Sequence, residues 1–149
     1  MWFRVFGTND AQPQPAALLE HLAAEGLEVT GQFRGDDLGW FRAELACGPD
    51  SLPLERYLVS EEGIRAELNN WAAWIETCEG NPHQGRLMQH MISTTQLFTL
   101  RQPLQPADRA LVEKVCVAVC QHLARETAGV YQADARGIFA ADGALLLRE

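Results

Sequence analysis

The same order of predicted secondary-structure elements occurs twice along the chain and limits the folds that it can adopt. Residues 1–47 have the pattern of strand, helix, strand and strand, and residues 94–149 have strand, helix and two or three strands. Short strands joined by glycine-containing turns favour antiparallel pairing, and each helix needs a sheet on which to bury its apolar side chains. The pattern therefore predicts an α+β fold in which two β-α-β-β units form a mixed, antiparallel-rich sheet with helices packed on one face.

The two units share one short sequence match near the end of each predicted helix. The segment His21–Glu25 reads HLAAE, the segment His122–Glu126 reads HLARE, and a glycine and a valine follow each of them. This match indicates an internal repeat of residues 1–47 and 94–149, with residues 48–93 as a helical insert. Helix ends also share composition by chance, so unrelated units stay an open alternative.

The insert begins with a predicted strand and continues as two helices. The strand, Leu52–Leu58, contains Pro53, which cannot donate a backbone hydrogen bond, so we expect an edge strand. Ser60 has the side chain of a helix N-cap, and the following helix is predicted to run to Thr77. A shorter helix is expected over residues 83–91.

Length and composition indicate a single soluble domain. The chain has 149 residues, of which 47% are apolar and 21% are charged, as in ordinary globular proteins. Its longest apolar run, Val115–Cys120, is far shorter than the about 20 residues that span a bilayer, so we expect no membrane segment. The cysteines show no CxxC spacing and the N-terminus has no signal-peptide pattern, which favours a cytoplasmic protein.

The net charge restricts the kinds of partner. Lysine and arginine total 12 and aspartate and glutamate total 20, which gives a net charge of −8. The arginines are scattered singly, so no basic stripe offsets the repulsion of a phosphate backbone, and we do not expect nucleic-acid binding. The same charge attracts a basic partner protein.

No motif of a common enzyme class occurs in the chain. Glycine-rich phosphate loops, HExxH, GxSxG and paired CxxC sequences are all missing. Cys116 and Cys120 fall on or beside an apolar helix stripe, where cysteine is usually a buried core residue rather than a metal ligand. We therefore assign no catalytic residue, metal or cofactor. An enzyme without a recognisable motif, with His83 or His90 near Glu79 or a cysteine, remains an alternative.

The candidate binding residues are two acidic and two aromatic side chains, namely Asp36, Asp37, Trp40 and Trp74. The aspartates lie in a predicted hairpin turn that Trp40 directly follows, and Trp74 lies on the flank of the next helix. Tryptophan is enriched where proteins contact ligands and partners. Because successive residues of a strand face opposite sides, Trp40 and Phe41 must lie on different faces of the sheet.

One predicted helix needs additional cover. The helix over residues 106–127 is apolar on every side between Val115 and Cys120, whereas a helix that lies on one sheet needs one apolar face. Either the first helix of the insert or a second subunit could cover Val117 and Ala118. A homodimer is therefore open.

These observations favour a non-enzymatic binding or interaction module for a protein or a small hydrophobic ligand. The first alternative is an acidic inhibitor or immunity-type protein that neutralises a basic partner, which the net charge of −8 permits. The second alternative is the enzyme without a recognisable motif.

Overall fold

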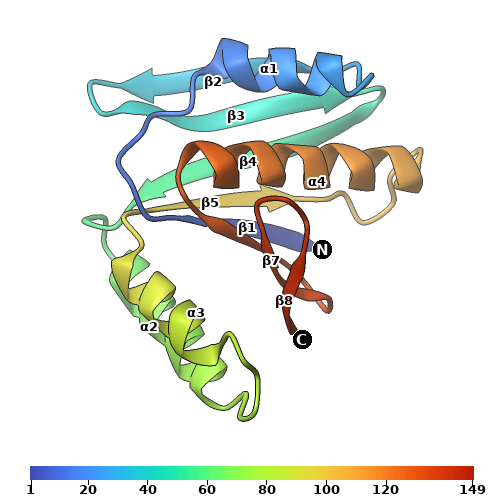
Figure 1. Ribbon diagram of the computed structural model, residues 1–149. Helices are drawn as coiled ribbons and strands as arrows, with labels where there is room; N and C mark the ends of the chain where they lie inside the picture. The colour runs from blue at the N-terminus through green and yellow to red at the C-terminus, as the bar shows by residue number, and fades with distance from the viewer.

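Eight strands form one antiparallel sheet, with four helices packed on it (Figure 1). The computed structural model describes all residues, 1–149. The first half contains β1 (Trp2–Gly7), α1 (Pro15–Ala24), β2 (Thr30–Asp36), β3 (Gly39–Cys47) and β4 (Asp50–Leu58). The second half contains α2 (Ile64–Glu76), α3 (Gln84–Ser93), β5 (Gln96–Arg101), α4 (Arg109–Glu126), β6 (Val130–Ala133), β7 (Gly137–Ala140) and β8 (Leu145–Arg148). The predicted α+β class, with an antiparallel-rich sheet in one domain, is confirmed.

The strand order is β2-β3-β4-β5-β1-β6-β7-β8. Every neighbouring pair is antiparallel, so the sheet has none of the parallel pairs of a mixed sheet. The first strands of the two units, β1 and β5, pair at the centre of the sheet. Strand β4 of the insert links β5 to β3 and β2 of the first unit, whereas β6, β7 and β8 of the second unit continue the sheet from β1. The internal repeat stays a prediction.

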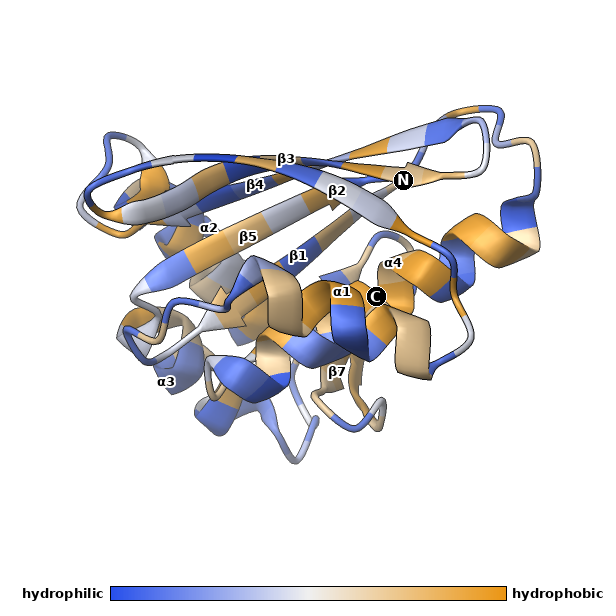
Figure 2. Ribbon diagram, turned by 90° about the horizontal axis from the view of Figure 1, so that it is seen from above, coloured by the Kyte–Doolittle hydropathy of each residue, from blue (hydrophilic) through white to orange (hydrophobic).

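Strand β1 places buried residues on both faces of the sheet, although Trp2 at its start is exposed. Phe3 and Val5 belong to the core under α1 and α4, and Phe6 belongs to a second core under α2 and α3. Helices α1 and α4 lie together on one side of the sheet, as expected (Figure 2). Helices α2 and α3 cover part of the opposite side, which differs from the expectation of helices on one face. The reason is that β1, β5 and β6 carry apolar side chains on both faces.

Strand β4 is an interior strand, so the prediction of an edge strand was wrong. It pairs with β3 on one side and β5 on the other. Pro53 is tolerated because the pairing with β5 begins only at Leu54, while Pro53 is opposite Glu44 of β3. A proline that lies just outside the residues paired with one neighbouring strand therefore does not identify an edge strand.

Helix α2 begins later than its sequence predicts. Its N-cap is Gly63, which has a φ of 85°, and Ser60 lies in the preceding turn. A positive φ is readily adopted by glycine. The buried side of the helix has Leu68 and Ile75 in the core and Trp71 packed against it.

Helix α1, rather than α2, packs beside α4 within the chain, although Val117 and Ala118 still line a cavity of about 450 Å³ at the surface of α4. Ala118 is buried, and Val117 packs against the core that α1 and α4 share. Helix α2 lies on the other face of the sheet, so it covers neither residue. A homodimer stays a prediction.

None of the four helices combines the length and the apolarity that a membrane crossing requires.

We expect Phe6→Ala to lower the free energy of unfolding by about 3–5 kcal/mol, because it leaves a cavity beneath α2 and α3. Phe6 is 0% exposed and makes an edge contact with Trp71, with ring centroids 5.7 Å apart. Urea denaturation measures the loss. Phe41→Ala is the matched control, because Phe41 is 42% exposed. An equal loss in both variants would contradict the two-core description.

Candidate interaction surface

Trp40 is a core residue, and Phe41 is its exposed neighbour. Trp40 is 7% exposed, and its indole Nε1 donates a hydrogen bond of 2.7 Å to the carbonyl oxygen of Pro13. Its ring packs against Phe33 and Phe98. The predicted division of Trp40 and Phe41 between the two faces is confirmed, and Phe41 is the aromatic residue at the surface.

The acidic hairpin turn is held from beneath by a buried arginine. Arg56 Nη1 donates to the carbonyl oxygens of Leu38 (3.1 Å) and Trp40 (3.2 Å), and its Nε donates to Gln96 Oε1 (2.8 Å). Arg56 is 6% exposed, and this burial lowers the pKa of its guanidinium. In the turn itself, Asp36 Oδ1 accepts a hydrogen bond of 2.8 Å from the backbone N–H of Leu38. Arg56 is thus a positioning residue for this turn.

Three adjoining cavities lie along the sheet face that carries Phe41. The first has a volume of about 520 Å³ and lies between the hairpin turn and the end of β4. The second, of about 410 Å³, lies between the central strands and the start of α2. The third, of about 270 Å³, lies beside α2. The first and second share Glu55 and Tyr57, and the second and third share Glu67. We call the three cavities together the open-face channel.

The lining of the open-face channel carries more carboxylates than cations. The carboxylates are Asp36, Glu55, Glu61, Glu62, Glu67 and Glu149, and the cations are Arg4, Arg42 and Arg56. Arg42 pairs with Glu44 (2.7 Å) and Glu55 (3.0 Å), and Arg4 pairs with Asp134 (2.8 Å). Each lining arginine is therefore engaged within the chain, and the channel presents a net negative charge.

Tyr57 lies where the first and second cavities meet. Its hydroxyl donates a hydrogen bond to Glu55. Burial, together with this bond to a carboxylate, raises the pKa of Tyr57 to about 12. The phenol is therefore neutral at physiological pH, and its ring gives the channel an aromatic wall between charged groups.

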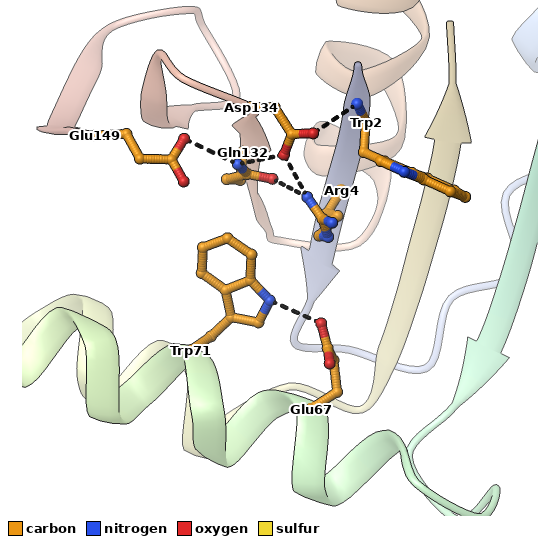
Figure 3. Close-up of polar contacts among 7 residues, drawn as sticks. All are labelled: Trp2, Arg4, Glu67, Trp71, Gln132, Asp134 and Glu149. Atoms are coloured by element: carbon orange, nitrogen blue, oxygen red, sulfur yellow. Dashed lines mark hydrogen bonds and ion pairs between the residues drawn. The ribbon is translucent and has the colours of Figure 1, made fainter.

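The far end of the channel is built around Trp71 of α2 (Figure 3). Its indole Nε1 donates a hydrogen bond of 3.1 Å to Glu67 Oε1, and the guanidinium carbon of Arg4 lies 5.3 Å from the ring centroid. Arg4 Nη1 also donates to Gln132 Oε1 (2.7 Å) and Asp134 Oδ1 (2.8 Å). These contacts join α2 to strand β1 and to the end of β6.

The predicted binding residues are not gathered into one site. Asp36 and Trp74 lie at opposite ends of the open-face channel. Asp37 borders a small cavity of about 220 Å³ that adjoins the first one at Leu38, Arg56 and Leu58, and Trp40 is buried in the core. Sequence reasoning missed Glu55 and Tyr57, although the alternation of apolar and polar residues along β4 places both on the face opposite Leu52 and Leu54.

The histidines of the alternative enzyme hypothesis lie apart from the channel. His83 precedes α3, and its backbone N–H donates to Asn81 Oδ1 (2.7 Å). His90 Nε2 lies 2.9 Å from the carbonyl oxygen of Phe6, and burial lowers the pKa of His90. Neither side chain lines any of the three cavities.

The cysteines of α4 occupy the core, as expected. Burial raises the pKa of Cys116 to about 12 and that of Cys120 well above its ordinary value. Both thiols are therefore protonated at physiological pH. No group of three or more histidine, cysteine or acidic side chains is arranged as metal ligands.

Comparison with family models, with curated proteins and with solved structures finds no match to this chain.

A second feature, on the other face of the sheet, links stability to pH. The rings of His21 and His122 stack with centroids 4.9 Å apart, and His122 Nε2 is buried without a hydrogen-bond partner. Burial and the neighbouring His21 lower the pKa of His122, as does Arg125, while Glu126 opposes the shift. The unfolded chain therefore binds a proton at this position at higher pH than the folded protein does.

We expect the free energy of unfolding to be highest at pH values above about 6.5, which is the pKa of histidine in the unfolded chain. It should fall as the pH drops below that value. Each unit of pKa depression corresponds to about 1.4 kcal/mol lost on full protonation. His122→Leu should show a smaller loss between neutral and mildly acidic pH, and His90 should account for part of the remainder because burial lowers its pKa too. Urea denaturation across this range tests the expectation. A loss as large in His122→Leu as in the parent protein would contradict it.

Proposed function

We propose that the protein is a non-enzymatic binding module that holds a basic segment of a partner protein in the open-face channel. The observation that carries the proposal is the excess of carboxylates along the channel, where every lining arginine is already engaged within the chain. Such a surface attracts cations and speeds their association. The proposal joins the binding-module hypothesis to that of an acidic protein that neutralises a basic partner.

The aromatic side chains of the channel suit the same occupant. Trp2 and Phe41 are exposed large side chains, and Tyr57, Trp71 and Trp74 are half-buried in the lining. Aromatic rings bind both the aliphatic stems and the charged ends of lysine and arginine. A small hydrophobic ligand is less well matched, because it would desolvate the carboxylates without pairing them. We keep a cytoplasmic location as part of the proposal.

Charge reversal at the channel should weaken the binding of a short basic peptide. Glu62 is exposed, lines the second cavity and makes no side-chain hydrogen bond or ion pair, so Glu62→Lys changes the charge without breaking an internal contact. We expect about a threefold to fivefold weaker affinity, the range of an exposed ion pair, and a smaller salt dependence. Isothermal titration calorimetry at low and high salt provides the measurement.

Glu76→Lys is the matched control, because Glu76 is an exposed residue of α2 that lies outside the channel. It makes the same change in net charge. Equal weakening in the two variants would mean that only the overall charge attracts the peptide. Equal binding of an acidic peptide of the same length would also count against the proposal.

The two aspartates of the hairpin turn should differ in their effect on association rate. Asp36 lines the first cavity and Asp37 does not. Asp36→Asn should therefore slow association with the basic peptide more than Asp37→Asn, and asparagine can still accept the hydrogen bond from Leu38. Stopped-flow kinetics at low salt measures both rates. A larger effect from Asp37→Asn would place the binding surface elsewhere.

A further inference from the structure

We propose that the third cavity of the open-face channel is a subsite for one arginine side chain of the bound segment. This inference rests on the proposed function and specifies its ligand. The cavity has a volume of about 270 Å³ and is lined by Glu67, Asn70, Trp71, Trp74 and Glu149. It lies at the end of the channel, where the bound segment passes α2.

The lining offers acceptors and a negative charge without a cation of its own. Glu67 Oε1 accepts from Trp71, and Glu149 Oε2 accepts from Gln132 at 3.3 Å, whereas the other oxygen of each carboxylate accepts no hydrogen bond. The side-chain amide of Asn70 is also without a hydrogen bond. A guanidinium carries five N–H donors in a planar fork and can bond to several acceptors at once.

The two indoles add an aromatic surface for the same group. Trp71 and Trp74 meet edge to face, with centroids 5.7 Å apart and planes at 86°. Arg4 already lies over Trp71, at 5.3 Å from its ring centroid, whereas no cation of the chain lies over Trp74. We assign the incoming guanidinium to the ring of Trp74.

Two guanidinium groups of the protein already lie over indole rings. Besides Arg4 over Trp71, the guanidinium carbon of Arg101 lies 5.5 Å from the ring centroid of Trp2. Arg4 does not exclude a second guanidinium, because its charge is paired with Asp134 at 2.8 Å. Lysine would keep the charge but lose the planar stack and the fork of donors, so the subsite prefers arginine.

The experiment compares two peptides of equal length and charge, one with arginine and the other with lysine as its cations. The parent protein should bind the arginine peptide about threefold to fivefold more tightly, the range of an exposed cation–π contact. Trp74→Leu should abolish this preference while both peptides still bind. Phe41→Leu, which removes an aromatic ring from the first cavity, should weaken both peptides and keep the preference.

Two further measurements test the subsite even if the Trp74→Leu variant does not fold. Glu149→Gln alters an exposed side chain and should also reduce the preference. Arginine amide alone, added to the parent protein, should shift the indole N–H resonance of Trp74 in a nitrogen–proton correlation spectrum. Equal affinities for the two peptides, with an unmoved Trp74 resonance, would overturn the subsite and leave the proposed function standing. Failure of both peptides to bind would overturn both.

Discussion

The need to bury apolar side chains of strand β1 on both faces of the sheet is the constraint on which the rest of the structure depends. Phe3 and Val5 need the layer of α1 and α4, whereas Phe6 needs the layer of α2 and α3. An apolar face of a sheet is stable only when another element covers it. The α2–α3 pair covers β1 and its neighbours but not the outer face of β3 and β4, where Phe41 is exposed. The open-face channel therefore exists because the second helical layer is smaller than the sheet.

The position of α2 also determines which aromatic and charged side chains line the channel. The ring of Trp71 meets that of Phe6 edge to face and lies under the guanidinium of Arg4, so the same side chain contributes to the core and to the channel wall. The partners of Arg4, Gln132 and Asp134, come from β6 and the residue that follows it. Charged groups between a sheet and a helix must be paired to offset their desolvation, and Arg4 meets this condition. What remains unpaired are carboxylates such as Glu62, which is why the channel suits a cation.

Structural features that depend on neighbouring residues in the chain could be predicted from the sequence, whereas those that depend on distant residues could not. The turn between β2 and β3 and the strand β5 follow from turn residues and from the residue pattern, and both were found. Pro53 led to the wrong prediction of an edge strand. A proline prevents pairing only with the strand that would accept its missing N–H, and the pairing of β4 with β5 starts at the next residue, Leu54. Ser60 was wrongly predicted to be the N-cap of α2, because the helix begins later, after Gly63 with its positive φ.

The sequence alone determined the elements, the acidic charge and the separation of Trp40 from Phe41, because these depend on neighbours in the chain and on the alternation of a strand. The tertiary structure alone decided the strand order and the channel. Trp2, Glu55, Glu67 and Glu149 lie along that channel although long stretches of chain separate them. Their proximity depends on which strands pair and on which face each helix settles, and both are set by burial of the whole apolar surface rather than by any local pattern.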